Sequence, residues 1–306
     1  MTLALICSGQ GRLSRDMLSP FADYAETRLL FAAAEARLGM PPLIFLADAT
    51  DAELAANRNS QILCVTRSLA VATVLNVGEL PADTIVTGYS IGELAAWGVA
   101  DVWKSEHVID LAARRAEAMD CAGGPDGLLG YVRGLSEAAV QGLCDRHRCH
   151  IAIRNPDRLF VVGGGEPDVL ALCIEAEAQG AVRAAAMNVH VASHTPLLES
   201  AVAPFQTALL SVEPERPRLR LMSTERQSLV SSPARAIPYL AAQMASPIDW
   251  AATLIALQER GVSRILELGP GSALAEMANA ASRDWEARSF DDFETASGAA
   301  HWARRP

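Results

Sequence analysis

The stretch Asp83–Ala100, DTIVTGYSIGELAAWGVA, joins a short apolar run to an alanine- and leucine-rich segment through a serine that stands between two glycines. The apolar run predicts a buried strand, and the segment after it predicts a helix. A G-x-S-x-G sequence at such a turn holds its serine in a tight elbow, where the glycines avoid collisions between Cβ atoms. We therefore predict that the Ser90 hydroxyl is presented to a ligand. The backbone N–H of Ile91 would lie at a helix N-terminus, which favours an oxyanion.

Two other short β-prone runs are built in the same way. Leu3–Cys7 is followed by the loop SGQG, and Arg264–Leu268 by the loop GPGS, just as Thr84–Thr87 is followed by GYSIG. Strands that alternate with helical segments form parallel sheets, and the ligands of such sheets gather at the carboxyl ends of the strands. We therefore expect an α/β domain in which three loops share one site.

The middle of the chain, from about residue 127 to 187, has a different order of predicted elements: strand, helix, strand, strand, helix, strand. This βαββαβ order is typical of a small ferredoxin-like module. The sequence thus predicts a large, hydrolase-like α/β domain with a parallel sheet over residues 1–120 and 189–306, and an inserted small ferredoxin-like subdomain over residues 121–188. Beyond about Ala281 we expect a last strand followed by loosely held residues.

Composition restricts the partners. The 306 residues have a formal net charge of -10, and no basic run interrupts that acidity, which argues against nucleic acid or an anionic membrane surface as partner. Six cysteines without C-x-x-C spacing predict free buried thiols rather than disulfides or a zinc site. The N-terminus resembles neither a signal peptide nor a membrane span. These features favour the cytoplasm and no bound metal.

A serine nucleophile needs a base, which is commonly histidine. His194 lies in the segment SHTPLL, on a predicted loop where the small module rejoins the large domain. That position suits a cleft, and a purely structural histidine is the alternative. Arg114 and Arg115 lie together on the helix that follows the serine helix. An arginine that points into the cleft would suit an acyl group carrying a carboxylate, whereas a solvated helix face is the alternative for this pair.

Taken together, these motifs resemble the malonyl-CoA:acyl-carrier-protein transacylases over nearly the whole chain. SGQG is similar to the opening GQG loop of that family, GYSIGE to its G-H-S-x-G-E elbow, RRAEAM to its arginine helix and SHTPLL to its histidine segment. QMASPIDW and ELGPGSAL match two further segments in the same order. With Tyr89 where histidine is usual, the elbow most resembles the epsilon subunit of bacterial malonate decarboxylase, which loads malonyl onto the carrier protein of that complex. A transacylase of fatty-acid or polyketide synthesis is the alternative.

The resemblance implies acyl transfer in two steps. His194 would take the proton of Ser90, which attacks the thioester of malonyl-CoA, and the N–H groups of Gln10 and Ile91 would hold the oxyanion. The malonyl-serine ester would then pass to the thiol of an acyl-carrier protein, whose phosphopantetheine-type arm derives from dephospho-CoA. No bound cofactor is implied.

The same resemblance implies a substrate-binding set. Arg115 matches the carboxylate-binding arginine of the family, with Arg114 as the fallback. A main-chain carbonyl near Gln243 would hold the second nitrogen of the histidine ring. Gln61 and Asn155 match positions that line the same cleft, and ordinary polar surface positions are the alternative for both.

Two other classes of function compete with this interpretation. A serine esterase or thioesterase would share the elbow and a histidine, but an α/β-hydrolase carries that histidine near its C-terminus. His194 instead precedes the predicted strand over residues 264–268. A catalytically inactive fold that only docks a carrier protein would be expected to have lost Ser90 or His194, and both are present.

Overall fold

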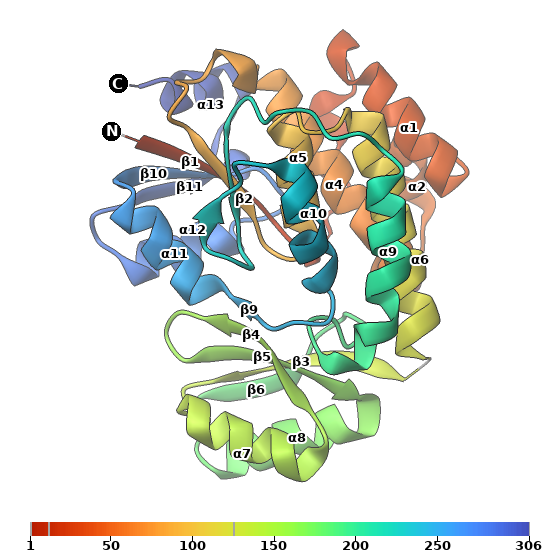
Figure 1. The fold of residues 1–306 in the computed structure, drawn as a ribbon, viewed down its shortest axis with the longest axis vertical. Coiled ribbons are helices and arrows are strands. Elements are labelled where there is room, and N and C mark those ends of the chain that lie inside the picture. Colours follow the sequence, from red (N-terminus) through yellow and green to blue (C-terminus); the bar gives the residue numbers. More distant parts are fainter. Residues whose placement is uncertain (1, 12, 125, 306) are drawn as a thin grey trace.

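The computed structural model describes residues 2–11, 13–124 and 126–305. Its larger sheet contains β1 (Thr2–Cys7), β2 (Ile85–Gly88), β7 (Arg220–Ser223), β8 (Ser228–Leu229), β10 (Val262–Glu267) and β11 (Glu286–Ser289). The strand order is β11-β10-β1-β2-β7-β8, and all neighbouring strands are parallel except β7 and β8 (Figure 1). The parallel sheet predicted from sequence is therefore present.

The three strands predicted before glycine-containing loops lie side by side at the centre of this sheet. Strand β1 pairs with β10 on one side and with β2 on the other, with Ile6 opposite Glu267 and Cys7 opposite Gly88. Because all three strands run in the same direction, their following loops leave the same edge of the sheet. The expectation that these loops come together is confirmed.

The smaller sheet contains β3 (Gly127–Arg133), β4 (His150–Asn155), β5 (Leu159–Gly165), β6 (Arg183–Ala186) and β9 (Ile248–Asp249), in the order β6-β3-β5-β4-β9. Helices α7 (Glu137–His147) and α8 (Glu166–Ala178) cover the face that points away from the larger sheet (Figure 1). From β3 to β6, the elements follow the order predicted from sequence. The difference is β9, which comes from beyond residue 188 and pairs parallel with β4. The smaller sheet is thus not formed by the middle segment alone.

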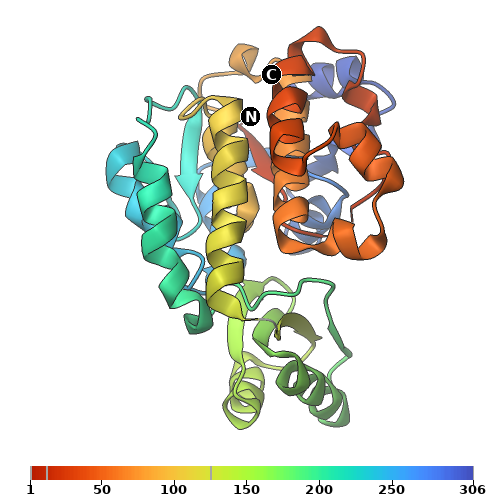
Figure 2. The ribbon, with the colours of Figure 1, turned by 90° about the vertical axis from the view of Figure 1, so that its right-hand side faces the viewer.

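The remaining helices pack mainly around the larger sheet. They are α1 (Arg28–Leu38), α2 (Pro42–Asp48), α3 (Asp51–Ala55), α4 (Asn57–Val74), α5 (Ile91–Val99), α6 (Ser105–Gly123), α9 (Glu199–Leu210), α10 (Pro233–Ala242), α11 (Trp250–Glu259), α12 (Ala273–Ala281) and α13 (Ala296–Ala303). Helix α6, yellow in Figure 2, packs against α4 on one side and α9 on the other. In the described ranges no single helix is long and apolar enough to cross a membrane; the segments Ala25–Leu38 and Pro42–Asp48 pass such a test only jointly, across a bend of 53°.

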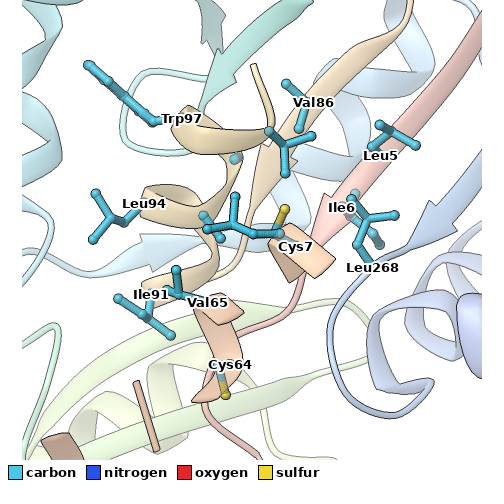
Figure 3. Packing of buried hydrophobic residues seen from close by; sticks show 14 of the residues in the cluster. Leu5, Ile6, Cys7, Cys64, Val65, Val86, Ile91, Leu94, Trp97 and Leu268 are labelled. Atoms are coloured by element: carbon cyan, nitrogen blue, oxygen red, sulfur yellow. The ribbon is translucent and has the colours of Figure 1, made fainter. Parts of the chain in front are cut away.

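The main hydrophobic core includes the place where β1, β2 and α5 meet. Ile6 and Cys7 of β1, Val86 of β2, and Ile91 and Leu94 of α5 belong to one buried hydrophobic cluster, which also contains Cys64 and Val65 of α4 (Figure 3). Every residue of α5 is buried, so this helix has no polar face. Because closely packed cores leave little room for adjustment, the turn between β2 and α5 is held from both sides.

The end of the chain differs from its prediction. After β11 the chain forms α13, whose Trp302 is almost fully buried and whose Ala299 is fully buried. The guanidinium of Arg264 on β10 donates to the main-chain carbonyl of Trp302 at 2.7 Å. The prediction of loosely held residues is therefore wrong. Helix α13 buries Trp302, and Arg264 of β10 donates a hydrogen bond to a carbonyl at the end of this helix.

Candidate active site

The turn between β2 and α5 forms the predicted elbow. Ser90 stands between the strand and the helix with φ of 56° and ψ of -122°, a conformation that side chains other than glycine rarely adopt. A Cβ atom at Gly88 would lie 2.0 Å from the carbonyl oxygen of Gly92, and one at Gly92 would lie 2.1 Å from the carbonyl oxygen of Cys7. Both flanking glycines are therefore required by close backbone contacts, as the motif predicts.

The side chain of Ser90 meets the predicted histidine. Its Oγ lies 2.7 Å from Nε2 of His194, and Nδ1 of the same ring lies 2.7 Å from the main-chain oxygen of Gln243. A carbonyl oxygen only accepts hydrogen bonds, so Nδ1 carries the ring proton and Nε2 presents its lone pair to the serine hydroxyl. This tautomer is the one required to remove the serine proton, and among the described residues no carboxylate is hydrogen-bonded to the ring itself.

The histidine is held in place by its backbone as well as by its ring. His194 is fully buried, and its φ of 63° lies in the left-handed region. Its N–H donates to the main-chain oxygen of Met244 at 2.7 Å. Burial, reinforced by the positive charge of Arg115, lowers the pKa of His194 to about 3, although the hydrogen bond to Gln243 opposes the shift. The imidazole is therefore neutral at physiological pH and free to accept a proton.

A buried carboxylate supports the segment that holds the histidine, and the sequence interpretation missed it. Glu93, in the first turn of α5, accepts hydrogen bonds from the side-chain amide of Gln243 and from the hydroxyl and N–H groups of Thr224. Burial raises the pKa of Glu93 to about 7, and its hydrogen bonds with Thr224 and Ser223 oppose the shift. The available signal was an acidic residue in an otherwise apolar helix, which must find polar partners when it is buried.

The loop after β1 brings Gln10 to the site. Ser8, two residues earlier, donates to the buried carboxylate of Glu267 at 2.6 Å, and the other oxygen of Glu267 accepts from the N–H of Ala275 at 2.8 Å. Gln10 and Ser90 line the same small cavity, and Ile91 is the first residue of α5. Of the two residues predicted to supply oxyanion donors, Gln10 shares a cavity with the serine and Ile91 directly follows it in the chain, and the first loop is anchored through Ser8.

The structure distinguishes the two arginines on α6. Arg114 is half exposed and forms an ion pair with Asp110 at 2.8 Å, whereas Arg115 is buried and donates from Nη1 to Oε1 of Gln61 at 2.8 Å. Within the described residues, Nη2 of Arg115 has no hydrogen-bond partner. Arg115 forms no ion pair with any described residue, although the charge of Glu93 acts on it, and its free donor suits it to bind a carboxylate.

Asn155 is the last residue of β4 and is buried. Neither atom of its amide group is hydrogen-bonded to any residue that the structure describes. Such groups rarely remain unpaired in a folded protein, and the Tyr89 hydroxyl lies within reach of this amide, since its interaction with Asn155 opposes the burial that raises the tyrosine pKa. Next to the serine, the ring of Tyr89 packs edge to face against Trp250 with centroids 5.3 Å apart, and its hydroxyl interacts with Asn155.

A large cleft leads to the serine. A cavity of about 30 Å³ is lined by Ser90, His194 and Gln10. A cleft of about 920 Å³ shares Gln10, Met187 and Val189 with it and is lined by the loop after β1, by α3 and α4, and by the β3–β6 side of the smaller sheet. Among the described residues, no group of three or more His, Cys, Asp or Glu side chains is arranged to hold a metal ion. The cleft is large enough for an extended ligand whose reactive end reaches the serine.

Comparison with known proteins is consistent with this geometry. A family model described as the acyl transferase domain matches residues 53–304. The chain belongs to this acyl transferase family. It is 28% identical over 295 residues to the malonyl CoA-acyl carrier protein transacylase of Mycobacterium tuberculosis, a match that covers 94% of this chain and 95% of that protein.

Solved structures of acyl transferases share the fold. The acyl-carrier-protein S-malonyltransferase of Burkholderia pseudomallei has a TM-score of 0.89 and 26% identity, with coverage of 98% of this chain and 100% of that one. A type II polyketide synthase malonyl-transacylase, solved in complex with its acyl-carrier protein, has a TM-score of 0.90 at 23% identity and covers 98% and 99% of the two chains. The mixed α/β class predicted from sequence is confirmed.

Proposed function

We propose that this acyl transferase moves a malonyl group from malonyl-CoA to the thiol of an acyl-carrier protein through a malonyl ester of Ser90. The observation that carries the proposal is the environment of Arg115. Its guanidinium is buried, its Nη2 atom lacks a partner in the described part of the chain, and its charge lowers the pKa of His194, which supports a position near the reacting pair. A free carboxylate on the acyl group would satisfy this donor.

In the first half-reaction, Nε2 of His194 takes the proton from Ser90 while Oγ attacks the thioester carbonyl. The N–H groups of Gln10 and Ile91 stabilise the oxyanion of the tetrahedral intermediate. As the intermediate collapses, the carbon–sulfur bond breaks, and the proton on Nε2 passes to the departing CoA sulfur. The products are the malonyl-serine ester, free CoA and a neutral His194.

The second half-reaction reverses these roles. The carrier thiol gives its proton to Nε2 of His194, and the sulfur attacks the ester carbonyl within the same oxyanion site. When the ester bond breaks, the histidine returns the proton to Oγ of Ser90. Asn155 and Gln61 line the acyl site in this proposal, and the carbonyl of Gln243 keeps the ring in one tautomer throughout.

We further infer that the carrier belongs to the broad group of acyl-carrier proteins rather than specifically to malonate decarboxylase. The curated relatives are named malonyl CoA-acyl carrier protein transacylase or, in the human protein, its mitochondrial form. These names support a transacylase of fatty-acid or polyketide synthesis over the epsilon subunit of malonate decarboxylase. Tyr89 is the feature that favours the decarboxylase branch. We also propose that residues 121–188 form a ferredoxin-like subdomain, to whose sheet β9 adds a strand, within an acyltransferase domain over residues 1–120 and 189–306.

The test is the intact mass of the protein after brief incubation with malonyl-CoA, and separately with acetyl-CoA. We expect a malonyl adduct that maps to Ser90, is stable in water and is absent from the Ser90→Ala variant. Addition of a fatty-acid-type carrier should remove the adduct and yield malonyl-carrier. Transfer only to a carrier with a dephospho-CoA-derived arm would instead support the decarboxylase branch. Rapid release of free malonate without a carrier would contradict transfer and indicate a hydrolase.

A further inference from the structure

A chain of polar side chains connects α6 to the loop that carries Gln10. Asn57, the first residue of α4, accepts hydrogen bonds at Oδ1 from the amide nitrogens of Gln61 at 2.7 Å and Gln10 at 3.2 Å. Its own amide nitrogen donates to the carboxylate of Asp120 at 2.7 Å and to the main-chain oxygen of Ala116 at 3.4 Å. Every hydrogen-bonding direction of this amide is therefore accounted for.

This arrangement is not a local helix cap. The N-cap position of α4 is Ala56, and no side chain caps that end of the helix. The partners of Asn57 lie instead on α6, on the loop after β1 and one turn further along α4, and α4 and α6 pack side by side (Figure 2). Asn57 is also buried, with 9% of its surface exposed. Its interactions thus connect separate elements around the proposed acyl site.

The carboxylate of Asp120 determines the orientation of each amide in the chain. An ionised carboxylate only accepts hydrogen bonds, so Asn57 must turn its nitrogen toward Asp120 and its oxygen toward the two glutamines. Gln61 must then turn its nitrogen toward Asn57, which leaves Oε1 facing the guanidinium of Arg115 at 2.8 Å. If Gln61 were reversed, its amide nitrogen would face another donor, and Arg115 would lose its only hydrogen-bond acceptor among the described residues.

We propose that Asn57, oriented by Asp120, is a positioning residue that sets the preference of the site for acyl groups with a carboxylate. It acts through Gln61, which holds one nitrogen of Arg115 and leaves the other for the ligand, and it also holds the side chain of Gln10. This inference rests on the proposed malonyl transfer and deepens it. Neither Asn57 nor Asp120 is required to touch the substrate.

The test compares Ser90 acylation by malonyl-CoA and acetyl-CoA, with kcat/KM measured for each thioester. Asn57→Leu should lower kcat/KM for malonyl-CoA by roughly tenfold to a hundredfold, because a buried amide loses its partner next to Arg115. Acetyl-CoA does not use the guanidinium, so its kcat/KM should fall only as far as release of the Gln10 side chain disturbs the oxyanion loop, and clearly less than that for malonyl-CoA. Asn59→Leu, on the same helix, removes a hydrogen bond to the Glu53 carbonyl and should leave the ratio unchanged.

An exchange variant tests the proposed orientation directly. Asn57→Asp combined with Asp120→Asn places the acceptor-only group at position 57, where it still accepts from Gln10 and Gln61. Because position 57 then no longer donates to the Ala116 carbonyl, this pair should restore part of the malonyl preference that Asn57→Leu loses. Asp120→Ala alone, at an exposed position, should lose part of it. If Asn57→Leu does not fold, these two variants still decide the question.

Two results separate failure of this inference from failure of the proposed function. If the wild-type protein forms no malonyl ester, the proposed function is wrong and the inference falls with it. If wild type does form the ester, an unchanged malonyl-to-acetyl ratio in Asn57→Leu or Asp120→Ala would overturn the inference alone. In an Arg115→Ala background, Asn57→Leu should have no further effect on the ratio, and an equal loss in both backgrounds would also overturn it.

Discussion

Ser90 and His194 both hold their backbones at positive φ, 56° and 63°, and their side chains meet at 2.7 Å between Oγ and Nε2. Neither residue is a glycine, so each conformation costs on the order of 1–3 kcal/mol and persists only because the surrounding structure imposes it. At Ser90 the constraint comes from the packed turn between β2 and α5. At His194 it comes from main-chain and ring hydrogen bonds to the segment after α10.

The packed turn leads to the first prediction. Gly92→Ala places a Cβ atom 2.1 Å from the carbonyl oxygen of Cys7, so strand β1 and the elbow must move apart. We expect a loss of roughly 3 kcal/mol or more in the free energy of unfolding, together with loss of Ser90 acylation. Chemical denaturation and intact mass measure the two effects.

The matched control is the same substitution in a helix with free space. Gly142 lies in α7, and its nearest atom to an added Cβ is the mobile end of Arg146 at 3.5 Å. Gly142→Ala should stabilise the protein by about 0.5–1 kcal/mol. If Gly92→Ala were as well tolerated as this control, the close packing of the elbow would be refuted.

The second prediction concerns the two neighbouring arginines. Arg115→Ala should lower kcat/KM for malonyl-CoA by roughly a hundredfold or more, because the acyl carboxylate would be buried without a partner. Acylation by acetyl-CoA should be maintained. Arg114→Ala removes only an exposed ion pair with Asp110 and should change neither rate by more than about twofold. If Arg114→Ala produced the larger loss in kcat/KM for malonyl-CoA, Arg114 rather than Arg115 would bind the carboxylate.

The third prediction is the pH dependence of Ser90 acylation. Burial and the charge of Arg115 lower the pKa of His194 from 6.5 to about 3, so the ring remains deprotonated in weak acid. Between about pH 8 and pH 5.5, kcat/KM should not show the roughly tenfold fall that an ordinary histidine base would produce. Rapid-quench measurements with malonyl-CoA provide the profile, and a protonation step near pH 6.5 would contradict the buried, neutral ring.

The lowered pKa of His194 also makes the stability of the folded protein depend on pH. The folded pKa of His194 lies below the unfolded value, so the unfolded chain binds more protons in acid. The contribution of this residue is present above about pH 6.5 and is lost as the pH falls below it. His194→Ala should therefore reduce the dependence of thermal stability on pH over this range while slowing both half-reactions.

The fourth prediction concerns Glu93, whose pKa is raised by burial, whereas that of His194 is lowered. Its pKa rises from 4.5 to about 7 in the folded protein, so the fold favours the protonated acid and loses stability as the pH rises through that window. Glu93→Gln mimics the protonated form and keeps an oxygen for Thr224 and Gln243. Relative to wild type, it should gain on the order of 1–3 kcal/mol between about pH 5 and pH 8.

Differential scanning calorimetry at several pH values measures this gain. Glu259→Gln, an exposed position at the end of α11, serves as the control and should show almost no pH-dependent difference. If Glu93→Gln and the control behaved alike, the carboxylate of Glu93 would have to be ionised throughout.

The sequence was most informative where the chemistry is local. The elbow around Ser90 is specified by two glycines within five residues, and the loops after β1 and β10 carry their own turn residues. His194 was identified from its loop position and from the resemblance, which also directed attention to Gln243. The structure adds that the carbonyl against the ring is that of Gln243 itself.

The supporting residues could not be predicted because their partners are distant in sequence. Glu93 contacts Thr224 and Gln243, which lie 131 and 150 residues away, and Asn57 reaches Asp120 across 63 residues. No local period or motif encodes such pairs, since they depend on how helices pack in three dimensions. The same reason explains β9, whose two residues have no strand signal of their own and form a strand only where β4 offers an open edge.

That short strand limits how this protein can be recombined with its relatives. Ile248 and Asp249 pair with Ile153 and Arg154, and the segment just before them supplies the carbonyl that holds His194. A chimera that exchanged residues 121–188 alone would join a foreign β4 edge to the native β9 and would disturb the histidine through it. A chimera that exchanges the smaller sheet should therefore take residues 121–188 and residues 243–249 from the same parent protein.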